Sequence, residues 1–218
     1  VKKNCELLEF VDDSFMKDKE FVLEAVKEKP SPMIYADDSL REDKDFILKA
    51  VKKNGLVLYY ADDSLRKDKD FALEALKING FALEGVDDSF KKDKKFILEA
   101  TKQINTCDGQ LFLTILEFAD ESLRKDKEIV LEVVKQDGLA LQYADDSLKK
   151  DKEVVLEAMK ENPRAMMDAD DSLMTDKEIV LMGFNYDVEL LDFAADSLKK
   201  DKEFILELVK IDGYALEF

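Results

Sequence analysis

Histidine and tryptophan are absent from this 218-residue sequence, which has only two cysteines, three prolines and seven glycines. Without histidine, the chain lacks the commonest general base and the commonest zinc ligand in proteins. The two cysteines, Cys5 and Cys107, are too few for a disulfide scaffold or a cysteine-based zinc site. No apolar run approaches the roughly 20 residues that a membrane-spanning helix requires. These absences disfavour histidine-dependent enzymes, disulfide-rich secreted domains and integral membrane proteins.

The few cysteines also bear on cellular location. Two scattered thiols fit a reducing compartment, and no signal segment is visible at the start of the sequence. We therefore expect a cytoplasmic location.

Acidic residues, in contrast, are abundant. The sequence has 51 acidic and 34 basic residues, a net charge of −17, and 46% of its residues are hydrophobic. That hydrophobic content is enough for a packed core. A negative field of this size repels nucleic acids and anionic membranes. We expect a protein partner, and a basic one fits the charge; direct binding of nucleic acid or a membrane is not expected.

A repeated phrase dominates the sequence. Asp-Asp-Ser-Leu, or a close variant, recurs along the whole chain and is followed by Asp-Lys. The serines of the eight copies, which number the repeats one to eight, are Ser14, Ser39, Ser64, Ser89, Ser122, Ser147, Ser172 and Ser197. Their spacing is 25 residues, except for one step of 33 between Ser89 and Ser122. Eight repeats with one eight-residue insertion therefore account for almost the entire chain.

The third repeat, Ala61–Gly85, shows the expected local structure. Asp62 is expected to cap a single helical turn, and Asp68 to cap a longer helix whose apolar residues have helical spacing. Asn79-Gly80 predicts the end of this helix, because glycine tolerates the left-handed conformation of a C-terminal cap. A second, shorter helix is predicted over Phe81–Leu83. Each repeat then has two antiparallel helices of roughly 11 and 6–8 residues plus the capped turn.

Helices this short are marginally stable in isolation, so stacking between repeats must stabilise them. No period-two alternation or β-branched run indicates a strand. The predicted fold is an all-α solenoid, a superhelical array of about eight 25-residue two-helix repeats that forms one domain over residues 1–218.

Two columns of the repeat are nearly invariant. The first is a leucine in the long helix, as at Leu73. The second, two residues later, holds a small residue in most repeats, as at Ala75. We expect this leucine to be the central core position and the small residue to allow close helix packing. The leucines are Leu23, Leu48, Leu73, Leu98, Leu131, Leu156, Leu181 and Leu206.

The ends of the sequence are not polar capping repeats. Val1–Phe10 and Val209–Phe218 are the same half-repeat. We expect a fragment of a longer array. The alternative is that the two open ends associate head to tail, a contact that can build filaments.

Several segments resemble a known repeat family. Phe21–Lys27 reads Phe-Val-Leu-Glu-Ala-Val-Lys, and Asn54-Gly55 and Tyr-Ala segments recur after such helices. With these features the chain resembles the repeats of the domain of unknown function 4116, best in Ala61–Gly85 and Ala119–Tyr143. The aspartate-rich turn departs from the glutamate-rich turn that is commoner in the family. The resemblance implies a helical repeat array and brings no activity or catalytic residue with it.

The insertion at residues 103–113, between the fourth and fifth repeats, is the largest departure from the pattern. It predicts either a lengthened second helix, a docking element with an exposed thiol, or a tolerated loop insertion. If it docks a partner, the candidate interaction residues are Thr106, Cys107, Asp108, Gln110 and Phe112.

No constellation of residues indicates catalysis, a cofactor or a metal. The paired aspartates are nearly equivalent on eight turns and lack the asymmetry that acid–base catalysis needs. A calcium loop starting at Asp62 would place Arg66 and Lys67 at ligand positions. The repeated serine is expected to bond locally to the backbone. We therefore predict that the chain is not an enzyme.

The acidity is expected to be uniform along the array. Ala61–Gly85 has six acidic and four basic residues, and eight such repeats reproduce nearly the whole net charge. The predicted function is a non-catalytic scaffold for protein–protein interaction. Two alternatives are a self-assembling structural protein that uses its open ends, and an acidic decoy or nucleic-acid mimic that binds a basic protein.

Overall fold

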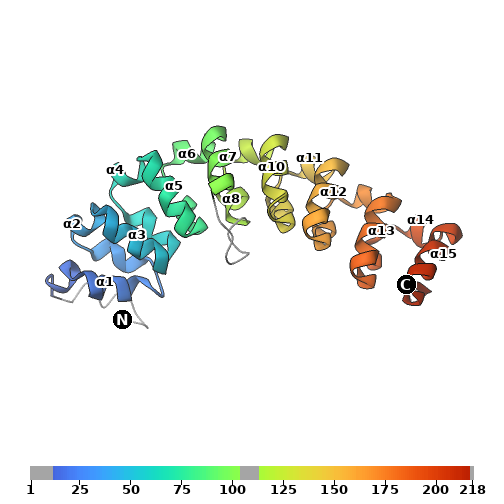
Figure 1. Ribbon diagram of the computed structural model, residues 1–218, viewed down its shortest axis with the longest axis horizontal. Coiled ribbons are helices and arrows are strands. Elements are labelled where there is room, and N and C mark those ends of the chain that lie inside the picture. Colours follow the sequence, from blue (N-terminus) through green and yellow to red (C-terminus); the bar gives the residue numbers. More distant parts are fainter. Residues whose placement is uncertain (1–11, 104–112, 217–218) are drawn as a thin grey trace. The chain divides into compact units, whose positions relative to one another are not determined.

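The structure, a computed structural model, describes residues 12–103 and 113–216, and in these residues every regular element is a helix (Figure 1). The predicted all-α repeat fold is confirmed. The chain divides into two compact units, Val1–Asp120 and Glu121–Phe218, with the boundary just before the fifth capped turn. Each unit is a stack of four repeats. A single array over residues 1–218 stays a prediction.

Every repeat has a one-turn helix, a long helix and a second helix, in that order. The capped turns are η2 (Phe15–Lys17), α2 (Asp38–Arg41), α4 (Asp63–Arg66), α6 (Asp88–Lys92), α9 (Glu121–Arg124), α11 (Asp146–Lys149), η8 (Asp171–Thr175) and α14 (Asp196–Lys199). The long helices are α1 (Lys19–Val26), α3 (Lys44–Lys53), α5 (Lys69–Ile78), α7 (Lys94–Gln103), α10 (Lys127–Val134), α12 (Lys152–Glu161), α13 (Lys177–Tyr186) and α15 (Lys202–Ile211). The second helices are η3 (Ser31–Tyr35), η4 (Gly55–Tyr60), η5 (Gly80–Glu84), α8 (Leu113–Phe118), η6 (Gly138–Tyr143), η7 (Pro163–Asp168), η9 (Val188–Phe193) and η10 (Gly213–Leu216).

The second helices have a different hydrogen-bond pattern from the one their sequences predict. Seven of the eight are 3₁₀-helices, and only α8 is an α-helix. Each of these 3₁₀-helices is at most six residues long and starts at a cap residue whose carbonyl accepts from the N–H three residues ahead; the cap is Asn or Asp except in η3, where it is Pro30. In η4, for example, the Val57 N–H donates to the Asn54 carbonyl at 3.1 Å. A 3₁₀-helix forms its first hydrogen bond between residues three apart, whereas an α-helix needs residues four apart. A segment this short therefore forms its hydrogen bonds more readily as a 3₁₀-helix.

Aspartate caps start the helices as predicted. The Asp68 carboxylate accepts from the Phe71 N–H at 3.1 Å, and the Asp62 carboxylate accepts from the Ser64 N–H at 2.8 Å. These bonds satisfy N–H groups that the first turn of a helix leaves without an intrahelical partner.

The shared leucine is not the central core position. It is partly exposed in seven repeats; Leu73 is buried, and Leu206 is 49% exposed. The core consists of the residues just before the leucine and of the small residue and its successor. In α3 these are Phe46, Ile47, Ala50 and Val51, each at most 1% exposed. The leucine lies at the margin of this buried stripe, because one more residue turns the side chain by 100°.

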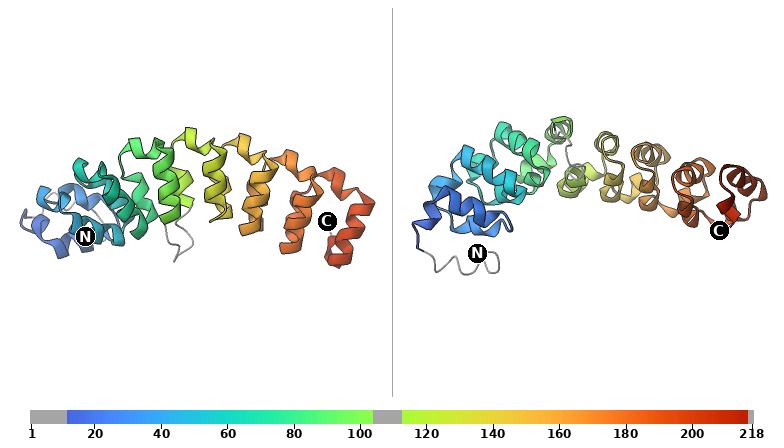
Figure 2. Two further views of the ribbon diagram at one scale, coloured as in Figure 1. Left: turned by 45° about the horizontal axis from the view of Figure 1, so that its top comes forward. Right: turned by 60° about the horizontal axis from the view of Figure 1, so that its bottom comes forward.

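A series of backbone hydrogen bonds joins consecutive repeats. The N–H of the residue that caps each turn donates to a carbonyl in the preceding capped turn, as from Asp62 to Arg41 at 3.0 Å. The same bond recurs at 3.0–3.1 Å in the pairs Asp37–Met16, Asp87–Arg66, Asp120–Lys91, Asp145–Arg124, Asp170–Lys149 and Ala195–Met174. Figure 2 shows the long helices of each unit lying side by side, as their contacts require. Within each unit, these bonds fix the register of one repeat on the next.

Ion pairs repeat with the same register. The first lysine of a long helix contacts the aspartate that caps the next long helix, as Lys44 contacts Asp68 at 2.6 Å. This contact lowers the pKa of the Asp68 carboxyl below its ordinary value. Equivalent pairs are Lys19–Asp43, Lys127–Asp151, Lys152–Asp176 and Lys177–Asp201, at 2.5–2.7 Å. Exposed pairs of this kind contribute modestly to stability, so the apolar contacts dominate.

The glycine at the start of the second helix serves packing rather than a left-handed cap. Gly55 and Gly138 do not have the left-handed backbone conformation. A Cβ on Gly55 would lie 2.5 Å from the Asn79 side chain, and one on Gly138 would collide with the Ala158 carbonyl oxygen of the next repeat. Gly213, in the last repeat, has no atom within 4 Å of its Cβ position. The glycine therefore lets the following repeat approach.

Candidate protein-interaction surface

The candidate residues of the insertion, Thr106, Cys107, Asp108, Gln110 and Phe112, lie outside the described residues. The prediction that they form a docking element therefore stays a prediction. The surface described below is built from other residues.

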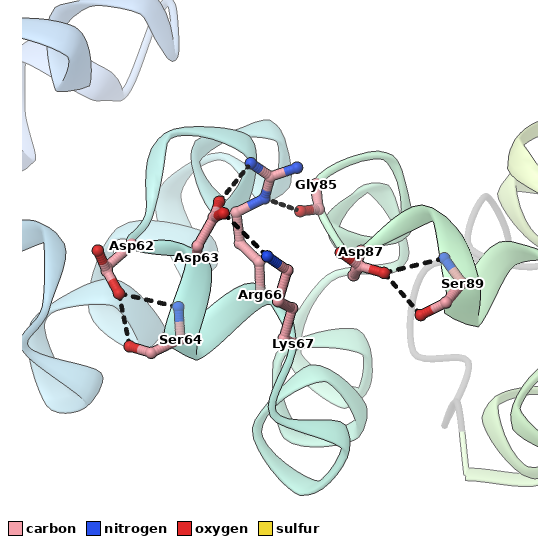
Figure 3. A network of polar contacts seen from close by, with 8 residues as sticks. All are labelled: Asp62, Asp63, Ser64, Arg66, Lys67, Gly85, Asp87 and Ser89. Carbon is pink, nitrogen blue, oxygen red and sulfur yellow. Dashed lines mark hydrogen bonds and ion pairs between the residues drawn. The ribbon is translucent and has the colours of Figure 1, made fainter.

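The polar side chains of the capped turn form hydrogen bonds and ion pairs with neighbouring groups (Figure 3). The Ser64 hydroxyl donates to the Asp62 carboxylate at 2.5 Å, and the Ser64 N–H donates to the same oxygen. The expectation that the serine hydroxyl bonds to the backbone is therefore wrong in this turn. The two bonds from Ser64 lower the pKa of the Asp62 carboxyl below its ordinary 3.8. Asp37, Asp87 and Asp145 accept from the serine two residues later in the same way.

The cations of the turn are also occupied. Arg66 and Lys67 lie 3.4 and 3.0 Å from the Asp63 carboxylate, and the Arg66 Nε donates to the Gly85 carbonyl at 2.8 Å (Figure 3). Within the part of the chain that the structure describes, no three cysteine or acidic residues are arranged to hold a metal ion. The paired aspartates of the turn are thus engaged as caps and ion-pair partners.

Burial raises the pKa of the Asp137 and Asp168 carboxyls. Asp137 caps η6 and accepts from the Leu139 N–H at 3.0 Å, and Asp168 ends η7. The charge of Lys149 partly offsets the effect at Asp168. Neither carboxyl has a nucleophile or metal ligand described beside it, so these shifts indicate partial burial in the second helices.

Exposed apolar side chains gather on the second helices. Thirteen large apolar side chains of the described residues are more than a third exposed, and eight of them lie on these helices: Ile34, Tyr35, Tyr59, Phe81, Met167, Phe193, Tyr214 and Leu216. Isolated exposed apolar residues are normal on a protein surface. Here, however, the exposed apolar residues are concentrated on one type of element. Most of them are aromatic residues or methionine, which are enriched at protein interfaces.

In the first unit these residues are held in defined positions. The second helices η3 and η4, which carry the exposed Tyr35 and Tyr59, contact each other. The Tyr59 ring meets the Tyr60 ring edge to face, with centroids 5.3 Å apart. The Arg66 guanidinium lies 5.3 Å from the Tyr59 ring centroid. Exposed aromatic rings that are fixed in this way lose little entropy on binding.

Two grooves lie in the second unit. One, of about 510 Å³, runs between α12 and α13 over Leu156 and Met182. The other, of about 360 Å³, lies between η7 and η9 and is lined by Met167, Leu190 and Phe193, together with charged residues. Both lie between consecutive repeats, where side chains of neighbouring helices leave space. The sequence signal for this surface is a bulky apolar residue two or three positions before the Asp-Asp-Ser phrase or its variant, as at Tyr59, Met167 and Phe193. The second helices are too short for these residues to show a helical period.

Comparison with known families agrees with this architecture. The family model described as Domain of unknown function (DUF4116) matches seven segments in tandem along the chain, six of them overlapping: residues 1–41, 22–66, 43–84, 68–124, 107–144, 126–174 and 176–218. The chain belongs to the DUF4116 family. The resemblance seen in the sequence is thereby confirmed. No curated protein and no solved structure matches this DUF4116 chain.

One further property concerns membranes. None of the helices described for this DUF4116 chain is long and apolar enough to cross a lipid bilayer.

Proposed function

We propose that this chain is a non-catalytic helical-repeat scaffold that binds a protein partner through its second helices. The observation that supports the proposal is the concentration of exposed large apolar side chains on these helices. A stack of repeats presents equivalent positions at regular intervals, so one extended partner can contact several repeats at once. Affinity then comes from a few aromatic or methionine anchors, as at other protein interfaces.

The proposal of a non-catalytic role has separate support. The sequence contains no histidine, and its repeated aspartates are used as helix caps and ion-pair partners in the described turns. A general acid or base needs a pKa matched to its reaction and a reacting group within hydrogen-bond reach. Asp137 and Asp168 have raised pKa values, but they lie in different second helices with no reacting partner described.

Photo-crosslinking tests the proposed function. With p-benzoylphenylalanine in place of Tyr59, we expect crosslinks to a defined protein from the source cell, in about 0.5 M salt, where exposed charge contacts are screened. The matched control has the same group in place of Lys49, an exposed residue of the long helix α3. This control is expected to give no such product.

Two outcomes would contradict the proposal. Identical products from both positions would mean that the second helices are not a preferred contact surface. Products that contain only a second copy of the chain would favour the self-assembling structural protein instead.

A further inference from the structure

The negative charge is unevenly distributed between the two units. Residues 1–120 have 26 acidic and 20 basic residues, whereas residues 121–218 have 25 acidic and 14 basic residues. The net charges are −6 and −11, so the expectation of uniform acidity is wrong. Within the second unit, residues 161–195 contain nine acidic and two basic residues, a net charge of −7. The equivalent stretch of the first unit, residues 53–87, has seven acidic and five basic residues, a net charge of −2.

This excess arises largely because the seventh repeat has lost cations. The sixth repeat has Lys149-Lys150 at the end of its capped turn, where the seventh has Met174-Thr175. Near the end of the long helix, Asn185 stands where the other seven repeats have lysine. Met174 is buried, so this position now contributes to the core instead of to the surface charge. The carboxylates nearby are left with fewer positive neighbours.

The groove between η7 and η9 lies within this acidic stretch. Met167 and Phe193, 53% and 43% exposed, line the groove together with the buried Leu190. Methionine adapts its shape to different apolar partners, and a phenyl ring provides a large contact area. An apolar side chain of a partner fits this environment.

The carboxylates of the same groove are only partly neutralised. Asp187 lies 3.7 Å from Arg164, and Asp192 lies 3.9 Å from Lys199. Glu189 is exposed and has no ion-pair partner among the described residues. Three carboxylates therefore line this groove together with its apolar side chains, against one lining cation, Arg164.

The groove between α12 and α13 differs in this respect. Its carboxylates are paired with lysines: Glu178 lies 2.8 Å from Lys152, Glu157 lies 2.6 Å from Lys160, and Glu153 lies 2.7 Å from Lys127. A cationic partner would have to displace these lysines. The groove between η7 and η9 is therefore the better match for a basic ligand.

We propose that the groove between η7 and η9 binds a basic segment of a protein partner that inserts one bulky apolar side chain between Met167 and Phe193. Lysine or arginine residues beside this anchor contact Glu189 and Asp192. The surrounding net charge of −7 accelerates encounter with a basic segment and disfavours acidic ones. This inference rests on the proposed function and specifies the chemistry of the partner.

A synthetic amphipathic helix of leucine and lysine, labelled for fluorescence anisotropy, is the probe. We expect saturable binding to the full chain that is weakened about tenfold by Met167→Ser, since truncation of an interface anchor typically costs this much. The double variant Glu189→Gln/Asp192→Asn should weaken binding to a similar extent. Matched controls outside the second helices, Leu206→Ser in α15 and Glu74→Gln in α5, alter exposed residues of long helices and should bind the probe like the parent chain.

Two comparison peptides separate charge from apolar contact. With serine in place of leucine the probe should lose most of its affinity, and with glutamate in place of lysine it should not bind. Equal affinity of the serine peptide, or equal weakening by Leu206→Ser and Met167→Ser, would overturn the proposed site. All variants alter exposed or half-exposed side chains, and an unchanged circular dichroism spectrum and melting midpoint verifies that they fold.

The failures of the two proposals are distinguishable. If p-benzoylphenylalanine at Tyr59 captures a partner but the leucine–lysine probe does not bind, the partner chemistry is wrong and the scaffold function stands. If the probe binds as expected and crosslinking gives no partner, the groove is a basic-peptide site and the wider second-helix surface is not used.

Discussion

Gly138→Ala is expected to destabilise the second unit by about 3 kcal/mol, the upper end of the range for overpacking. The added Cβ would collide with the Ala158 carbonyl oxygen and lie 2.9 Å from the Asn162 nitrogen. Both atoms belong to the backbone at the end of α12, so no side-chain rotation relieves the contact. The sixth repeat would have to move away from the fifth. Chemical denaturation of the full chain, followed by circular dichroism, measures the change in the free energy of unfolding.

Gly213→Ala is the matched control. Gly213 starts η10 just as Gly138 starts η6, and nothing lies within 4 Å of its Cβ position. Its substitution should change the free energy of unfolding by less than about 0.5 kcal/mol. Equal effects of the two substitutions would show that the glycine is needed for the local turn, as the sequence suggested, and not for contact between repeats.

Phe46→Ala should destabilise the first unit by about 3–5 kcal/mol, whereas Leu48→Ala should cost about 1 kcal/mol or less. Phe46 is 1% exposed in α3, so its removal leaves a cavity between packed helices. Leu48 is partly exposed at the margin of the same helix, where solvent replaces the lost side chain. The leucine is present in every repeat, whereas the phenylalanine is not. The residue that recurs less often is therefore expected to contribute more to stability.

The two α3 variants are measured in the same denaturation experiment. They share one helix and one repeat, which removes differences in helix propensity between sites. A larger loss for Leu48→Ala than for Phe46→Ala would restore the leucine as the central core position and contradict the packing described here.

The sequence predicted most of the fold because its signals are local. The Asp68 cap and the apolar spacing of α5 depend on residues within one helix, and the structure confirms both. That a residue recurs does not reveal whether it is required by contacts within its own repeat or by contacts with the next repeat. For this reason the sequence pattern assigns the glycine of Asn79-Gly80 to its own turn, whereas at the equivalent Gly55 the atoms that exclude a Cβ belong to the next repeat.

The candidate interaction surface was harder to predict. Met167 and Phe193 lie in second helices of six residues each, which are too short to show a helical period. The groove between them forms only when consecutive repeats stack, and the sequence does not give that geometry. Counting charge over a single repeat also concealed the excess at residues 161–195. A comparison of equivalent columns, such as Asn185 with the lysines of other repeats, was the available signal.

Amide hydrogen exchange at Asp62 tests most directly whether contacts between stacked repeats stabilise this structure. The N–H of a residue that caps a helix has no acceptor within its own repeat, and here it donates to the Arg41 carbonyl of the preceding repeat at 3.0 Å. We predict that the Asp62 amide exchanges as slowly as the core amides of α3, because it opens only when the repeats separate. Exchange of this amide at the rate of an unfolded chain, while α3 stays protected, would contradict the account.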